Sequence, residues 1–221
     1  MSAPPAAAVA VDVACCTVRD GALHVLLAQA RQGPFAGWWA LPGGLVREAE
    51  PLDEAAAREL REHAGLADCY LEQLYTFGHP LRDPLGRVVS VAYVGLVATD
   101  AATALPAGDD RYAALAWHRA AHLPPLAYDH AAVVRTAVAR LRAKLQYTNL
   151  AWGLVPRTFT LGELQSVYEA ILGRSLDRRN FRKKILSLGL LRALGRTRRG
   201  PHRPAALYAF RSRRPMTVAV L

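Results

Sequence analysis

The sequence predicts an α+β protein of two domains, a sheet-rich domain over residues 1–146 and a small basic domain over residues 147–221. In the first part β-rich runs alternate with two amphipathic helical patterns, whereas the second part reads as helix, turn, helix and hairpin. From residue 145 onward there are 15 Lys and Arg against 3 Asp and Glu, a net charge of +12. The first 144 residues hold 13 and 15, a net charge of −2. This split is typical of a neutral domain joined to a module that binds a polyanion.

Composition places the chain among globular proteins, because 52% of its 221 residues are hydrophobic. No run of 18 apolar residues occurs and the apolar N-terminal stretch has no basic leader, so we expect neither a transmembrane helix nor a signal peptide. The three cysteines, Cys15, Cys16 and Cys69, fit neither a disulfide framework nor a metal site. We therefore expect reduced core cysteines and a cytoplasmic protein.

The order of predicted elements follows from periodicity and turn residues. A hairpin over residues 8–30 turns at "RDGA", and a Gly/Pro/aromatic loop over 31–44 leads to a helix over 51–64. Two β-rich runs come next, then a helix near 129–145 and a linker, "QYTNLAWGLVPR". After the linker, Thr160 and Glu163 form a capping box that begins a further helix.

The 51–64 helix contains an acidic cluster preceded by spaced polar residues. Its members are Gly44, Glu50, Arg58, Glu59, Glu62 and His63. Positions 59, 62 and 63 are i, i+3 and i+4, so their side chains share one helical face. Three carboxylates there suit a hard divalent cation, which polarises phosphoryl oxygens. With an imidazole at position 63, we expect Glu59 and Glu62 to bind Mg²⁺ or Mn²⁺ only weakly.

This pattern resembles the Nudix box, Gly-x5-Glu-x7-Arg-Glu-U-x-Glu-Glu-x-Gly-U with U aliphatic. Every defined position of "GLVREAEPLDEAAARELREHAGL" matches except His63, where the family has glutamate. The resemblance implies an α/β/α sandwich, a pocket for a nucleoside diphosphate, and Arg58 orienting Glu59 as ligand or base. Since one ligand is replaced, we expect a vestigial catalytic site, and we expect His63→Glu to raise any hydrolase activity. The alternative for so charged a helix is a solvated face of ion pairs.

Candidate ligand contacts are arginines for phosphate, aromatic rings for a base, and residues of the box. They are Phe35, Trp39, Arg47, Arg58, Glu59, Glu62 and Arg82. For the two aromatic residues, core packing is an equally good interpretation.

The second helix of the basic domain has an apolar stripe on one face and charged residues on the opposite face. Arginine reads guanine edges, asparagine reads adenine, and lysine binds phosphate, so this face fits a recognition helix followed by a basic hairpin. The order indicates a winged helix-turn-helix domain that binds double-stranded DNA, with RNA binding or a merely solubilising face as alternatives. The candidate DNA contacts are Arg178, Arg179, Asn180, Arg182, Lys183, Arg196, Arg198, Arg199, His202 and Arg203.

Together, the altered box and "FTLGELQSVYEAILGRSLDRRNFRKKILSLGLL" resemble the Nudix-related transcriptional regulators of NAD metabolism, the NrtR family. The resemblance covers nearly the whole chain. It implies a homodimeric repressor of NAD biosynthesis or salvage genes that ADP-ribose, or a related NAD-derived metabolite, releases from its operator. Two alternatives stay open: an active Nudix pyrophosphatase acting on ADP-ribose, and an RNA-binding Nudix protein.

Overall fold

The computed structural model describes residues 6–102, 105–198 and 204–220, and its chain forms two compact units. The first unit holds the described residues up to 137, apart from the segments within 17–23 and 97–103. Those two segments belong with residues 138–221 in the second unit. Among the described residues, no helix has the length and apolar character needed to cross a bilayer.

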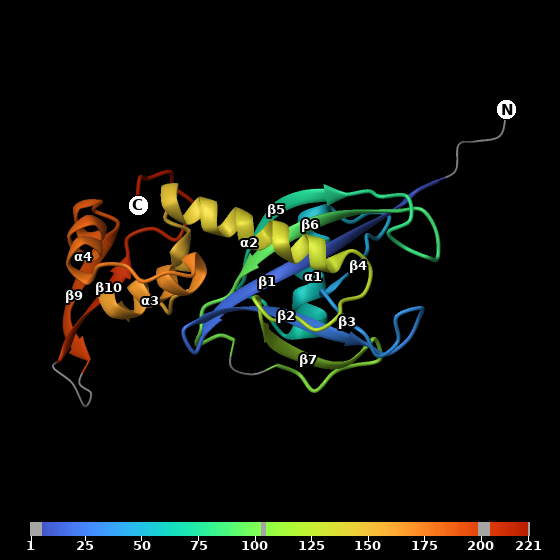
Figure 1. Cartoon of the computed structure of the whole chain (residues 1–221), viewed down its shortest axis with the longest axis horizontal. Coiled ribbons are helices and arrows are strands. Elements are labelled where there is room, and N and C mark those ends of the chain that lie inside the picture. Colours follow the sequence, from blue (N-terminus) through green and yellow to red (C-terminus); the bar gives the residue numbers. More distant parts are fainter. Residues whose placement is uncertain (1–5, 103–104, 199–203, 221) are drawn as a thin grey trace. The chain divides into compact units, whose positions relative to one another are not determined.

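The first unit is built on one mixed sheet (Figure 1). Its central strands follow the order β3-β2-β1-β6-β5, while β4 pairs with β1 and β7 pairs with β2. The strands β1 and β6 are parallel, and β4, β5 and β7 join the sheet antiparallel. The strand bounds are β1 Ala8–Arg19, β2 Ala22–Ala30, β3 Trp39–Ala40, β4 Gly43–Leu45, β5 Tyr70–Phe77, β6 Val88–Leu96 and β7 Tyr112–Arg119.

The predicted hairpin of the first two strands is confirmed and turns at Asp20 and Gly21. Both residues have positive φ, 48° and 69°. A two-residue loop with two positive φ angles is the type I′ turn, whose twist matches that of the flanking strands.

Helix α1, Leu52–Ala64, carries the acidic cluster. It begins after Pro51, and Gly65, in the left-handed conformation, ends it by donating its N–H to the carbonyl of Leu60. Its buried face is unusual: beside alanines and Leu60 it contains two charged residues, Arg58 and Glu59. These charges therefore need partners within the protein.

Helix α2, His130–Tyr147, starts one residue later than predicted and ends two later. Val134, Leu141 and Leu145 of the predicted apolar face are buried, and Val138 is half-buried. The predicted linker is instead packed, because its 3-10 turn η1, Leu150–Gly153, is wholly buried. Strand-like hydrogen bonds also cover its start: Val218 donates its N–H to the carbonyl of Tyr147.

The second unit contains the predicted winged helix-turn-helix, drawn from orange to red in Figure 1. Its antiparallel sheet has the order β8-β10-β9. The capping box is confirmed, because Thr160 and Glu163 exchange side-chain and backbone hydrogen bonds. The remaining bounds are β8 Phe159–Thr160, α3 Leu161–Leu172, α4 Arg178–Ser187, β9 Leu191–Arg198 and β10 Ala205–Phe210.

The two helices of this unit pack through aromatic and aliphatic side chains. Tyr168 of α3 meets Phe181 of α4 edge to face, with ring centroids 5.3 Å apart. Ile185 continues the buried stripe of α4. Asp177 caps α4 by accepting the N–H of Asn180 at 2.7 Å. Helix α4 thus buries its apolar face and leaves its basic face exposed to solvent.

Candidate functional site

The acidic helix is tied to the loop before it by a forked ion pair. Arg58 donates to Glu50 from Nε at 2.6 Å and from Nη2 at 2.9 Å, and to Glu59 from Nη1 at 2.7 Å. These hydrogen bonds from Arg58, with one from the N–H of Arg47, lower the pKa of Glu50 to about 2. Arg58 thus contacts Glu59 as the resemblance implies, and Glu50 is fully engaged as its anchor.

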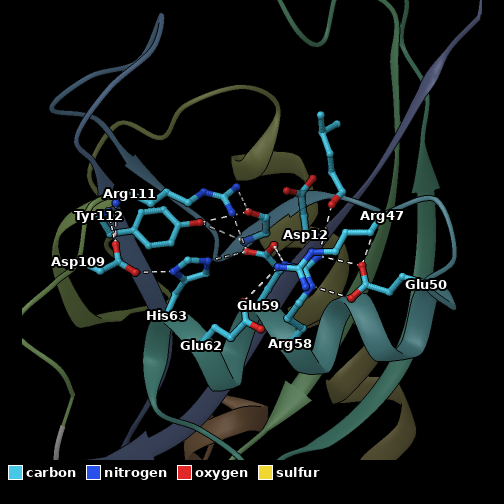
Figure 2. Close-up of polar contacts among 12 residues, drawn as sticks. Asp12, Arg47, Glu50, Arg58, Glu59, Glu62, His63, Asp109, Arg111 and Tyr112 are labelled. Atoms are coloured by element: carbon cyan, nitrogen blue, oxygen red, sulfur yellow. Dashed lines mark hydrogen bonds and ion pairs between the residues drawn. The ribbon is translucent and has the colours of Figure 1, made fainter.

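A second arginine, Arg111, approaches Glu59 from the start of β7 (Figure 2). Its Nη1 lies 2.9 Å from Oε2 of Glu59, and its Nη2 donates to the carbonyl of Gly43. The Glu59 side chain is only 1% exposed. This contact was not predictable from sequence, because the two residues lie 52 positions apart.

His63, the residue in place of the second glutamate, contacts the loop before β7 that also carries Arg111. Its Nδ1 bonds the carboxylate of Asp109, and its ring meets that of Tyr112 edge to face at 5.3 Å. Asp109 also accepts the N–H groups of Arg111 at 2.8 Å and Tyr112 at 2.7 Å. Burial disfavours the charged form of Asp109, but the bonds from His63 and these N–H groups keep its pKa below the ordinary value.

The acidic cluster does not fit a divalent cation in this arrangement. Glu62 is 42% exposed and pairs with Arg47 at 3.5 Å, while Glu59 is held between Arg58 and Arg111. Across residues 6–102, 105–198 and 204–220, no three His, Cys, Asp or Glu side chains are grouped to hold a metal. In this arrangement both Glu59 and Glu62 are paired with arginines, and weak binding of Mg²⁺ or Mn²⁺ by these two residues stays a prediction.

A cavity of about 520 Å³ opens beside this cluster. Such a volume suits a nucleotide-sized ligand. Its lining includes Asp12, Gly44, Arg82, Arg111, Tyr128 and His130.

The floor of the cavity is a buried charge network. Arg82 donates to Asp12 at 3.0 Å and to Asp129 at 2.7 Å, and its side chain is 3% exposed. His130 accepts the N–H of Leu41 at Nδ1, and its Nε2 lies 3.2 Å from Asp12. Burial alone would raise the pKa of Asp12, but His130, Ser90 and Arg82 hold it well below its ordinary value. Arg82 therefore fixes the cavity floor, whatever it contacts in a ligand.

The aromatic residues near the cavity only partly follow the predicted set. Phe35 packs on Tyr128, with ring centroids 4.5 Å apart, and Tyr128 lines the cavity. Trp39 meets His118 edge to face at 4.6 Å. Of these rings, Tyr128 is thus the one that lines the cavity, and its positive φ of 53° marks a constrained loop.

Of the predicted ligand residues, the structure groups Arg58, Glu59 and Glu62 on α1 and places Arg82 in the floor of the cavity. Arg47 pairs with Glu62 of α1 at 3.5 Å. The residues that sequence reasoning missed are Asp12, Asp109, Arg111, Tyr128 and His130. Each lies in a strand, in a loop or at a helix start, where no repeating pattern marks it. Whether these residues contact a ligand stays a prediction.

The basic helix α4 presents its charges as predicted. The side chains of Arg178, Arg179, Asn180, Arg182 and Lys183 are all exposed. Arg178 and Arg182 line a hollow of about 570 Å³ shared with the start of α3 and strand β10. Two arginines one turn apart beside a groove suit the edges and phosphates of a nucleic acid.

The wing carries the other predicted contacts. Arg196 is exposed on β9. Arg198 is also exposed, but it forms an ion pair with Glu163, so it has a protein partner at the start of α3. The remaining predicted contacts, Arg199, His202 and Arg203, lie outside the described residues.

Comparison with known proteins matches both units to described domains. Residues 8–140 match the NUDIX domain, and residues 151–210 match the NrtR DNA-binding winged helix domain. The "ADPR responsive transcriptional repressor NtrR" of Acinetobacter baylyi is 36% identical over 93% of this chain and 83% of its own length. An "ADP-ribose pyrophosphatase" of Methanocaldococcus jannaschii is 36% identical over 50% of this chain and 63% of its own.

Solved structures agree with these relatives. Shewanella oneidensis NrtR in complex with a 27mer DNA superposes with a TM-score of 0.83 at 34% identity, over 92% of this chain and 93% of that one. The NUDIX domain of the same protein in complex with ADP ribose gives 0.58 at 34% identity, over 62% of this chain and 90% of that one. The chain therefore belongs to the Nudix family and, within it, to the NrtR proteins that join a Nudix domain to a winged helix.

Proposed function

We propose that the protein is a DNA-binding transcriptional repressor that senses ADP-ribose, or a related NAD-derived metabolite, and controls genes of NAD biosynthesis or salvage. One observation carries the proposal: a nucleotide-sized cavity beside an acidic helix neutralised by arginines occurs in the same chain as an exposed basic helix. The relatives support it, because the Acinetobacter protein is named an ADPR responsive repressor and Shewanella NrtR structures contain DNA or ADP ribose.

Double-stranded DNA is the polyanion that the second unit suits best. Its net charge of +12 from residue 145 onward gives affinity, and the exposed arginines and asparagine of α4 give base readout. A gel-shift assay tests this with a duplex from the promoter that precedes the gene, a scrambled duplex and an RNA hairpin. A preference for the promoter duplex is expected, whereas a preference for RNA would favour an RNA-binding protein.

We further propose that the protein acts as a cytoplasmic homodimer. A palindromic operator needs two recognition helices separated by about 34–36 Å or a multiple of it, and a two-fold dimer provides them. Ligand control then requires that ADP-ribose favour one dimer geometry over another. Sedimentation of the full chain at micromolar concentration, with and without operator duplex, tests the dimer.

The second candidate is an active pyrophosphatase that cleaves ADP-ribose. It is favoured by the retained Glu50, Arg58, Glu59 and Glu62 and by the relative from Methanocaldococcus jannaschii. Release of AMP and ribose 5-phosphate in the presence of Mg²⁺ or Mn²⁺ tests it directly. Against it stand the arginine contacts of Glu59, which leave no carboxylate oxygen of that residue unpaired.

A further inference from the structure

We propose that Arg111 occupies the cation position of the acidic helix, so that the site binds the diphosphate of its nucleotide ligand without a divalent metal. This inference rests on the proposed function, because it concerns how the same cavity holds ADP-ribose. It assigns to this chain a built-in cation where a family with three box carboxylates binds a metal ion.

The first support is the saturation of Glu59 (Figure 2). One carboxylate oxygen accepts from Arg58 at 2.7 Å and the other from Arg111 at 2.9 Å. The Glu59 side chain is only 1% exposed, so these two guanidinium groups take up both of its carboxylate oxygens. A metal would have to displace the guanidinium of Arg58, whose side chain is 6% exposed, or that of Arg111, which already supplies a positive charge to the other oxygen of Glu59.

The second support is that the loop holding Arg111 is fastened by His63. The imidazole bonds Asp109, and Asp109 in turn accepts the backbone N–H of Arg111. A glutamate at position 63 would face the Asp109 carboxylate with a like charge and would not hold the loop in this way. His63, which departs from the box, therefore holds through Asp109 the loop that places Arg111 at Glu59.

The third support is the close approach of the ion pair to the main chain at Gly44. A Cβ at this position would lie 2.6 Å from Oε1 of Glu59 and 2.8 Å from both terminal nitrogens of Arg111. Only glycine leaves this space open, so the pair rests directly on the loop that begins the box.

Arg111 also remains accessible to a ligand. Its side chain is 43% exposed and lines the cavity together with Tyr128. A guanidinium has five N–H donors, of which the contacts with Glu59 and Gly43 use two. The unused donors remain for phosphate oxygens, which guanidinium groups bind through charge-assisted hydrogen bonds.

This arrangement changes the expectation for His63→Glu. The substitution alone is now expected to leave hydrolysis at the level of the parent, because Arg111 still holds Glu59 and Asp109 repels the new carboxylate. Release of AMP from ADP-ribose with Mg²⁺ or Mn²⁺ measures it. A clear rise with the single substitution would show that the cation position was available all along.

The test is calorimetric titration of ADP-ribose into the full chain, in EDTA and again in Mg²⁺. The parent is expected to bind equally in both buffers. Arg111→Ala and Arg111→Gln are expected to weaken binding in EDTA by about 10- to 100-fold, the usual loss of a charge-assisted phosphate contact. Arg119→Ala, which removes the same charge from the far end of β7, is the matched control and should bind as the parent does.

The outcomes separate this inference from the proposed function. Binding by the parent that requires Mg²⁺, or parental affinity of either folded Arg111 variant in EDTA, overturns the inference and leaves ADP-ribose as the ligand. No binding by the parent in either buffer overturns ADP-ribose sensing itself, and the inference with it. Thermal melting of each variant establishes that it is folded, and the glutamine variant keeps a donor for the Gly43 carbonyl if the alanine variant does not fold.

Discussion

Arg82→Ala is expected to cause the largest loss of stability of any single substitution considered in the first unit. The side chain is 3% exposed and is the shared partner of Asp12 and Asp129. Breaking a buried ion pair by removing one member costs about 3–5 kcal/mol, since the remaining charges stay buried. For a protein of this size each kcal/mol lowers the melting temperature by roughly 2–4 °C. Thermal melting and urea unfolding measure the loss.

The control is Arg87→Ala, which removes an exposed arginine whose contact is the carbonyl of Gly78. The pH dependence adds a second check. Because the pKa of Asp12 is depressed from its ordinary 3.8, its stabilisation is complete above that value and disappears as the pH falls below it. The difference between parent and Arg82→Ala should therefore shrink in acid. Equal melting of the two arginine variants at pH 7 would contradict the network.

Replacement of Arg182 by alanine is expected to produce the largest loss of DNA binding. The residue is exposed on α4 and lines the same hollow as Arg178. An arginine that reads a base edge contributes about 1–3 kcal/mol, so affinity for the operator should fall by about 5- to 150-fold. The slope of log affinity against log salt should fall by about 0.9 for each phosphate contact that is lost. Fluorescence anisotropy at three salt concentrations measures both quantities.

The matched control is Arg135→Ala, which removes an exposed arginine from α2 outside the winged helix. It should leave operator affinity unchanged. If Arg182→Ala and Arg135→Ala bind the operator equally, α4 does not read DNA through this face. Because Arg182 is exposed and carries no core packing, neither substitution should change the melting temperature.

Features with a repeating pattern were predictable from the sequence. The capping box at Thr160, the bounds of the helix predicted over residues 51–64 and the exposed charges of α4 all follow local rules that act over one or two helical turns. The Asp20-Gly21 turn is equally local. These positions determine where elements begin, end and face, and the structure agrees with them.

The partners of the box residues were not predictable in the same way. Glu59 meets Arg111 from a loop 52 residues away, and Asp12 meets Arg82 across 70 residues. No periodicity connects such pairs, since the sheet order decides which loops meet. The sequence alone therefore identified the lost glutamate at His63 but not the arginine that takes the place of a cation.

The linker shows the same limit. The segment was predicted only as a linker between the domains, yet Leu150, Trp152 and Leu154 are buried. Hydrogen bonds from residues near the C-terminus, including Met216 to Asn149 at 2.8 Å, cover this segment. A pairing of the chain end with a segment 67 residues earlier leaves no local signal.

The central claim is that one chain binds an operator and releases it when ADP-ribose fills the Nudix cavity. Fluorescence anisotropy of a labelled duplex from the promoter that precedes the gene, with ADP-ribose titrated at fixed salt, tests this most directly. The account predicts tight, sequence-dependent binding that ADP-ribose reverses. A complex that saturating ADP-ribose leaves intact, or no sequence-dependent binding at all, would contradict it.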